Sequence, residues 1–430
     1  MLSRKLSTLD NEEIIKLSPK VSFSGVSKML EPWMNLARER IFSLAAGGKV
    51  AKIAPKIMEV GFAKVLYAAD HLGMDIQQSN PYVLFAPDGT VTYNPIRIKR
   101  GFTYGAILNL EFDGMMATNN SLPNGCGFSI YEIEDPIPDV DLLEYLTSSQ
   151  QRIGNDQLSQ LGKGNHFAGV YNVIDPESGE DTHRRFVVVH CSGHVGGKLL
   201  SNPEEWLSDV EGFHNIETPH GDIVFLEGEA RNRYYNQFLL TESANAENRD
   251  ITMGEIFDKH PWKKLEEITH QGLIEKGASH IIGTQKHEGL MPIAFNPEEG
   301  LVAVKHKPNL TSEFLDKWTE GGRVRNLNLE NKFSKLNITP HGGGYEFIQP
   351  LDSLEINLDK NGINYFELKF RNSSENHKFT YFREIRNYMT FRRRQPIMNM
   401  VHQANMAEIV YELPGLMQIY PLKSIPGGSH

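Results

Sequence analysis

The chain has 430 residues, of which 40% are hydrophobic and 23% are charged, a composition typical of a globular protein with one large domain or several smaller ones. Its net charge of −10 argues against a protein that coats nucleic acid through a global positive field. It contains only two cysteines, no apolar run as long as a membrane span and no N-terminal secretory signal, so we expect a cytoplasmic protein with reduced thiols and no membrane partner.

Apolar periodicity predicts helices in the first 75 residues. In residues 30–46 and 54–74, apolar side chains recur at spacings of three and four. From about residue 80 to residue 135 the pattern changes to short runs that are typical of strands and are separated by Asp-Gly and Pro-Asn-Gly turns. These runs are residues 82–86, 90–94, 104–112 and 128–133.

The rest of the chain mixes buried strands with helices. The continuous apolar run at 184–193 predicts a strand buried on both faces, with its chemistry at its carboxyl end, and 301–306 predicts another buried strand. Residues 221–250 predict a long amphipathic helix, and 351–370 predict a hairpin with Lys-Asn-Gly at its turn. The last 50 residues are expected to begin with a basic helix and to finish on a strand at 416–423.

These elements together predict a mixed fold of the α/β or α+β class. We expect an N-terminal helical segment over residues 1–80 and a single large mixed-sheet domain over residues 81–424. Residues 425–430 are interpreted as a tail without function.

Five places combine a polar, metal-ligating or reactive side chain with neighbouring glycines. Glycine allows a backbone to approach a ligand closely, and thiolates and imidazoles are good ligands for manganese or zinc. The places are Cys126 in a Gly-Cys-Gly turn, Asn165 with His166, His190 at the end of the buried strand, His270 near Gly272, and His341 before Gly342, Gly343 and Gly344. Each has a structural alternative: a small cysteine in a turn, a capping asparagine, a packed histidine or a flexible loop.

The triple glycine after His341 is the most unusual of these places. Three consecutive glycines cost chain entropy, so we expect the loop to be kept open for a ligand to approach its backbone. The amide groups of Gly342 to Gly344 would then cradle a phosphate that is attached to His341.

The order of these motifs resembles that of the RtcB-type RNA ligases over roughly residues 102–424. Cys126 matches the family's Gly-Cys-Gly turn, residues 162–167 match Gly-x-Gly-Asn-His-Phe, and His190 matches the His-Ser-Gly strand end. His270 with Gln271 matches the family's His-Asn pair, and His341 to Gly344 match the loop of its guanylylated histidine. Pro292 falls in the Pro-Gly-Ser loop, and Lys423 falls at the Lys of the closing strand.

The resemblance implies an RtcB-like domain with a GTP- and Mn-dependent activity in RNA repair or tRNA processing. The enzyme would join RNA 3′-phosphate or 2′,3′-cyclic-phosphate ends to 5′-hydroxyl ends, with His341 as the catalytic residue that carries the nucleotide. One or two Mn²⁺ ions would be held by Cys126, His166, His190 and His270. Nucleotide binding falls on Asn165, His270, Gln271, Pro292, His341, Gly342, Gly343, Gly344 and Lys423. A non-catalytic RNA-end-binding protein with a structural metal, or a metal-dependent phosphoesterase, remains as an alternative.

The chain also departs from the family pattern. Pro123 replaces a metal-binding Asp, for which Asp113 is a candidate substitute, and Gly169 stands where the family reads guanine with a Glu. The second departure predicts weaker discrimination between GTP and ATP. Basic candidates for contacts to the RNA backbone are Lys198, Arg249, Arg392, Arg393 and Arg394.

Overall fold

The computed structural model describes the chain from residue 19 to residue 418, apart from residues 47, 119–122, 136, 143, 146–147, 149–160, 162–165, 193–196, 275–278, 283, 286–288, 297, 372 and 381. Helices and mixed sheets are combined in this part of the chain, so the expected α+β fold is confirmed. None of its helices is both long enough and apolar enough to cross a membrane.

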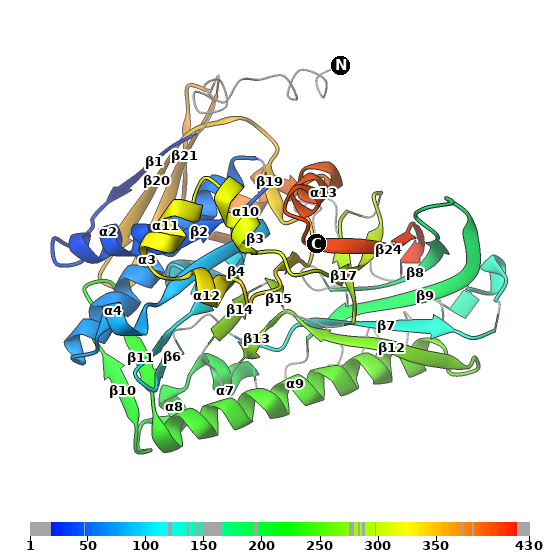
Figure 1. The fold of residues 1–430 in the computed structure, drawn as a ribbon, viewed down its shortest axis with the longest axis horizontal. Coiled ribbons are helices and arrows are strands. Elements are labelled where there is room, and N and C mark those ends of the chain that lie inside the picture. The colour runs from blue at the N-terminus through cyan, green and yellow to red at the C-terminus, as the bar shows by residue number, and fades with distance from the viewer. Residues whose placement is uncertain are drawn as a thin grey trace.

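The largest sheet of the described chain is antiparallel and has eight strands, most of which lie on the right of Figure 1. Its strands are, in order, β12 (Trp262–Thr269), β7 (Gly127–Ile133), β9 (Asp181–Cys191), β8 (Phe167–Ile174), β24 (Ala407–Leu413), β17 (Leu301–His306) and β16 (Leu290–Ala294), while β25 (Gly415–Gln418) also pairs with β8. Both faces of the sheet are covered. Phe186 and Val188 of β9 enter one hydrophobic core and Val187 and Val189 enter another, which explains the continuous apolar run.

A five-stranded sheet and two four-stranded sheets complete the main framework. The five-stranded sheet has the order β13 (Gln271–Ile274), β14 (Ser279–Ile282), β4 (Tyr104–Asn109), β3 (Tyr82–Thr90) and β2 (Ile41–Ser43). The four-stranded sheets have the orders β1 (Lys20–Ser24), β20 (Leu351–Asp359), β21 (Gly362–Phe370), β22 (Asn376–Phe379), and β10 (Phe213–Ile216), β11 (Ile223–Leu226), β6 (Met115–Ala117), β5 (Glu111–Phe112). Two short pairs join β15 (Thr284–Gln285) to β18 (Thr339–Pro340) and β19 (Tyr345–Phe347) to β23 (Met389–Phe391).

Helices cover the sheets. They are α2 (Glu31–Glu39), α3 (Val50–His71), α4 (Ile76–Ser79), α5 (Pro95–Lys99), α7 (Gly197–Ser201), α8 (Glu204–Leu207), α9 (Gly228–Ile256), α10 (Ser312–Lys317), α11 (Gly321–Asn326), α12 (Glu330–Phe333) and α13 (Arg394–Gln403), with a 3₁₀ segment η3 (Phe382–Tyr388). The central helix α3 is buried along most of its length and shares a hydrophobic core with β3, β4 and β20. The longest helix, α9, runs beside β7 and β12 (Figure 1).

Most of the predicted elements are confirmed, with differences at their ends. The helices expected in residues 30–46 and 54–74 are α2 and α3, but the N-terminal segment also supplies the unpredicted strands β1 and β2. Residues 91–94 are not a strand, because the side chain of Asn94 instead caps α5 by accepting hydrogen bonds from the amides of Ile96 and Arg97.

The helix expected from residue 221 begins later and ends later. Residues 223–226 form β11, so α9 starts only at Gly228, and it continues to Ile256. The basic residues near 392 are mostly not helical, because α13 starts at Arg394. The closing strand is described as β25 up to Gln418, and the rest of the predicted strand lies outside the described residues.

Candidate metal centre and the adjoining cavity

Strand pairing brings four of the predicted metal ligands to one edge of the large sheet. Cys126 directly precedes β7, His166 directly precedes β8, and His190 is the penultimate residue of β9. The register places His190 opposite both Phe128 of β7 and Phe167 of β8. His270 follows the last residue of β12, and its backbone amide donates to the carbonyl of Cys126 at 2.9 Å. The four residues therefore converge although they are far apart in the sequence.

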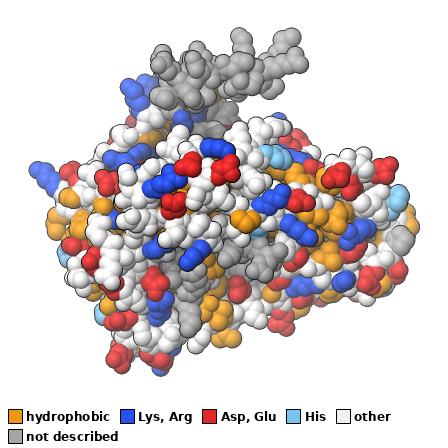
Figure 2. All heavy atoms as spheres, viewed as in Figure 1, with side chains coloured by type: hydrophobic (Ala, Val, Ile, Leu, Met, Phe, Trp, Pro, Cys, Tyr) orange, Lys and Arg blue, Asp and Glu red, His pale blue; other side chains and the backbone are white. Residues whose placement is uncertain are grey.

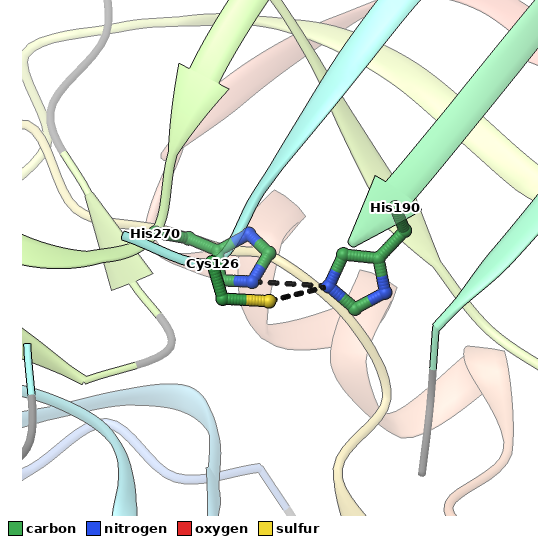
Figure 3. A group of neighbouring side chains, drawn as sticks. All are labelled: Cys126, His190 and His270. Atoms are coloured by element: carbon green, nitrogen blue, oxygen red, sulfur yellow. Dashed lines mark hydrogen bonds between the residues drawn. The ribbon is translucent and has the colours of Figure 1, made fainter. Parts of the chain in front are cut away.

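The side chains of these residues touch one another. The Sγ atom of Cys126 lies 3.4 Å from Nε2 of His166 and 3.4 Å from Nε2 of His190, and the Nε2 atoms of His190 and His270 are 3.1 Å apart. Figure 3 shows Cys126, His190 and His270 pointing toward one another, with His190 at the end of β9. Ligands of one tetrahedral ion, at bond lengths of about 2.0–2.3 Å, stand roughly 3.3–3.8 Å apart. The group Cys126, His190 and His270, whose donor atoms lie within 4.8 Å of one another, could thus hold a metal ion.

The electrostatics of the cluster also fit a cation. Burial raises the pKa of the Cys126 thiol to about 12, although the guanidinium of Arg249 acts in the opposite direction. Burial, with the imidazoles of His341 and His190, holds the pKa of His270 well below its usual value, so His270 is neutral, as a metal ligand must be. The Nδ1 atom of His270 is buried and has no hydrogen-bond partner among the described residues. A cation would satisfy the facing lone pairs of this group, and its binding would release the thiol proton.

A cavity of about 230 Å³ adjoins the cluster. Its wall includes His190 and Gln271 on one side and His341 with its three glycines on another. The ring of His341 lies 4.6 Å from the ring of His270, measured between centroids. The rest of the wall is largely aromatic, with Tyr93, Tyr104, Phe128, Phe167, Phe295, Tyr345 and Phe391. The predicted nucleophile His341 and one predicted metal ligand, His190, therefore line the same cavity, and the ring of His341 also contacts that of His270.

Asp88, which sequence analysis did not single out, binds His341 directly. The Oδ2 atom of Asp88 accepts a hydrogen bond from the His341 backbone amide at 3.0 Å and another from the His341 Nδ1. The side chain of Asp88 is fully buried, and its Oδ1 has no hydrogen-bond partner among the described residues. In the sequence, Asp88 belongs to a Pro-Asp-Gly run that is typical of an ordinary turn, so only its spatial position identifies it. A carboxylate acceptor at Nδ1 favours the tautomer with its proton on Nδ1 and its lone pair on Nε2.

The glycines after His341 serve close packing rather than an open loop. The amide of Gly343 donates to the carbonyl of Ala294 at 3.0 Å. A Cβ atom on Gly343 would lie 2.7 Å from the carbonyl oxygen of Arg392, and one on Gly344, whose φ is +69°, would lie 2.7 Å from that of Asp88. The expectation that all three amides cradle a phosphate is therefore wrong for Gly343, because its amide already has a partner. All three glycines do line the cavity.

The remaining predicted nucleotide-binding residues differ in whether they line the cavity. Gln271 lines the cavity, and its Oε1 accepts a hydrogen bond from Arg97 at 3.1 Å. Pro292 lies inside β16 opposite Ala303, and the residue of β16 that lines the cavity is Ala294. Asn165 and Lys423 lie outside the described residues.

Asp113 and two of the predicted RNA-binding arginines have other surroundings than expected. Asp113 is exposed in the turn between β5 and β6 and accepts from the hydroxyl of Ser79, whereas the buried carboxylate beside the site belongs to Asp88. Arg249 is fully buried and ion-paired with Glu267, and Arg392 is buried and donates to the carbonyls of Pro87, Gly89 and Tyr345. The predictions for these two arginines are therefore wrong, because their guanidinium groups are used inside the protein.

Lys198 and Arg393 stay exposed, and Arg394 pairs with Glu412. Figure 2 shows acidic and basic side chains interspersed over one face of the described chain, rather than gathered into a broad basic area.

No known protein family matches the sequence, and no curated protein is significantly similar to it.

Proposed function

We propose that this protein is an RNA ligase that joins 3′-phosphate or 2′,3′-cyclic-phosphate ends to 5′-hydroxyl ends, with GTP as nucleotide donor and Mn²⁺ as metal. The observation that carries this proposal is the meeting of a Cys-His cluster with a carboxylate-bound histidine at one cavity. The same residues occur in the sequence in the order of the RtcB-type RNA ligases. RNA ends and a nucleoside triphosphate would be the substrates, in RNA repair or tRNA processing.

His341 would act as the nucleophile. Because Asp88 holds the proton on Nδ1, the Nε2 lone pair can attack the α-phosphorus of GTP, and pyrophosphate leaves. The carboxylate of Asp88 stabilises the positive charge that the ring gains in this step. An RNA 3′-phosphate oxygen then attacks the same phosphorus, which breaks the bond to Nε2 and transfers the nucleotide to the RNA. Finally, the 5′-hydroxyl attacks the activated 3′-phosphate, and GMP leaves; a cyclic phosphate would first need to be opened by water.

Cys126, His166, His190 and His270 would hold the metal. A bound Mn²⁺ supplies charge that polarises a phosphate and offsets the negative charge that develops on it. The buried positions of Cys126, His190 and His270 keep bulk water away from the ligands and strengthen this interaction.

A non-catalytic RNA-end-binding protein with a structural metal is the main alternative. Such a protein has no need for a fully buried carboxylate that fixes the ring of a histidine at a cavity, and this contact favours catalysis. A metal-dependent phosphoesterase with the same ligands is the third candidate. It would release phosphate without forming a covalent nucleotide adduct.

Labelling with a nucleotide separates these candidates. The protein is incubated with Mn²⁺ and α-labelled GTP or ATP, and we expect an acid-labile adduct that is lost in His341→Ala while metal binding is retained. His402→Ala is the matched control, because His402 is exposed on α13. His306 is a poorer control, since its ring contacts Thr339, two residues before His341.

Two outcomes would contradict the proposal. A covalent adduct that persists in His341→Ala assigns the nucleophile to another residue. A wild-type protein that forms no adduct with either nucleotide supports the binding protein, or the phosphoesterase if phosphate is released from an RNA end.

A further inference from the structure

A second polar cavity lies outside the candidate metal centre. It has a volume of about 760 Å³ and shares no lining residue with the cavity at His341. Its wall is built from α3, the end of α5, the start of α8, the loop between β10 and β11, and the turn of the β20–β21 hairpin. Clefts of roughly 300–1,000 Å³ are typical of small-molecule sites.

Lys64, on the buried helix α3, is the least exposed charged residue that lines this cavity. Its side chain is about 1% exposed, and its Nζ donates to the backbone carbonyl of His220 at 3.0 Å. Among the described residues, no carboxylate lies within 4 Å of Nζ. Burial lowers the pKa of Lys64 to about 7, with Arg100 acting in the same direction and Asp222 against it. Near neutral pH the amine is therefore only partly charged, and an anionic ligand beside it would favour its charged form.

The ring of His220, whose backbone carbonyl accepts from Lys64, adds no charge beside the amine. Its Nε2 accepts a hydrogen bond from the amide of Ser27 at 3.0 Å, and its Nδ1 bonds to the carbonyl of Asp359. Burial also lowers the pKa of His220, so the ring is neutral. The contacts of His220 thus tie the segment that follows β1 to the end of β20.

Arg100 adds a second cationic group to the same wall; burial lowers its pKa, and the carboxylates of Glu204 and Asp222 act in the opposite direction. Its Nη1 is buried and has no hydrogen-bond partner among the described residues. Lys99 and Lys360 are exposed and line the same cavity. Two cationic donors at the inner end and two more near the opening favour an anionic ligand.

Three exposed carboxylates limit the size and charge of that ligand. Glu204, Glu217 and Asp222 line the cavity, so the cationic and acidic side chains nearly balance. The carboxylates would repel a long polyanion but can accept hydrogen bonds from hydroxyl groups of a small ligand. The buried Lys64 and the part-buried Arg100, with exposed side chains of both signs around the opening, therefore fit a small molecule with its anionic group inside.

We propose that this cavity binds a small phosphate or phosphate ester, whose phosphate group is bound by the side chains of Lys64 and Arg100. Phosphate oxygens would supply acceptors to Nζ of Lys64 and Nη1 of Arg100. This site is independent of the proposed ligase chemistry, because none of its residues belongs to the cavity at His341.

Titration calorimetry of metal-free protein tests the proposal, since metal removal prevents phosphate from binding through the candidate metal centre. The probes are inorganic phosphate and glycerol 3-phosphate, and binding of either supports the site; the tighter probe distinguishes free from esterified phosphate. We expect Lys64→Met and Arg100→Gln each to weaken binding about tenfold or more, because each removes a charged hydrogen-bond donor. Lys317→Met is the matched control, since the side chain of Lys317 is 73% exposed on α10, and its affinity should equal that of the wild type.

Thermal unfolding provides a second readout that does not depend on affinity. Lys64→Met should unfold at the same temperature as the phosphate-free wild type or higher, because it removes a buried ionisable group that is costly to desolvate, and should lose the upward shift that phosphate gives the wild type. If Lys64→Met does not fold, Arg100→Gln decides alone. Absence of binding to the wild type, or equal binding to the wild type and both variants, would overturn the proposal.

Discussion

The side chain of Asp88 fixes both the backbone and the ring of His341 through a single carboxylate oxygen. This arrangement sets the tautomer of the ring and stabilises a positive charge on it, which are two different contributions to a nucleophilic histidine. In the proposed reaction neither contribution requires contact between Asp88 and the substrate, so Asp88 would act as a positioning residue.

Asp88→Asn should therefore slow adduct formation while leaving the metal site intact. An amide cannot offset imidazolium charge, and we expect the single-turnover rate to fall by roughly 10²–10⁴-fold. The measurement is rapid-quench labelling, with metal content determined in parallel. Asp113→Asn, at an exposed turn, is the control. An unchanged rate in Asp88→Asn would show that the hydrogen bond to Nδ1 has no part in the chemistry.

The prediction that GTP and ATP are poorly discriminated depends on Gly169. It lies in β8 on the same face as Phe167, which lines the cavity, and a Cβ atom there would lie 2.6 Å from the hydroxyl of Tyr171. The side chain of Tyr171 thus occupies the space that a longer side chain at position 169 would need. Since the loss of a charged contact to the base costs about 1–3 kcal/mol, we expect only weak preference for GTP over ATP in competition labelling. A preference of several orders of magnitude would show that another residue reads the base.

At the scale of elements, helix α9 changes character along its buried face. Its first turns bury Ala230, Tyr234 and Phe238, whereas its middle turns bury Thr241, Asn245, Asn248 and Arg249. The amide group of Asn245 donates to the carbonyl of Asn124, two residues before Cys126, at 2.7 Å. The guanidinium of Arg249 donates to the carbonyl of Cys191, next to His190, at 2.7 Å. The polar turns of α9 therefore position the ends of β7 and β9 at the candidate metal centre.

Replacement of Arg249 tests this structural role. Arg249→Met removes the donors to Cys191, Ser129 and Glu267, and we expect the free energy of unfolding to fall by roughly 3–5 kcal/mol, as for other buried pairs that lose one partner. Arg233→Met, which breaks the exposed pair with Glu229 on the same helix, should cost less than about 1 kcal/mol. Urea denaturation measures both values, and similar losses in the two variants would contradict the assigned role of α9.

At the scale of the whole molecule, the candidate metal centre joins separate parts of the fold. Cys126 and His166 directly precede β7 and β8 of the eight-stranded sheet, and His190 lies in β9 of the same sheet. His270 links β12 of that sheet to β13 of the five-stranded sheet. A bound ion would thus connect the two sheets, and its binding free energy would add to the stability of the folded state.

Chelation should therefore lower the temperature of unfolding of the whole chain. At a free metal concentration 100 times the dissociation constant, binding contributes about 2.7 kcal/mol to the free energy of unfolding. Cys126→Ala should abolish both this stabilisation and the thiolate-to-metal absorption band given by Co²⁺, whereas Cys191→Ala should keep both, because Cys191 packs in a hydrophobic core. A Co²⁺ band that persists in Cys126→Ala would rule out Cys126 as a ligand.

The sequence by itself determined the features that depend on near neighbours. Apolar patterns located α2, α3 and the strand β9, and the Lys-Asn-Gly turn identified the β20–β21 hairpin. Neighbouring glycines distinguished the five candidate sites from the remaining histidines of the chain. The predictions of the helices, the strand and the hairpin succeed because helix and strand periods and turn preferences are properties of residues a few positions apart.

Only the tertiary structure decided which side chains share a site. Strand register places Cys126 next to His190, and a non-local hydrogen bond connects Asp88 to His341. Arg392 was expected at the surface, but it is buried and donates hydrogen bonds inside the protein. In the sequence, Lys64 likewise has the pattern of a polar residue on an amphipathic helix. In the structure it is buried, because α3 is covered on nearly all sides. Pairing partners and burial depend on segments far apart in the chain, and local periodicity carries no information about them.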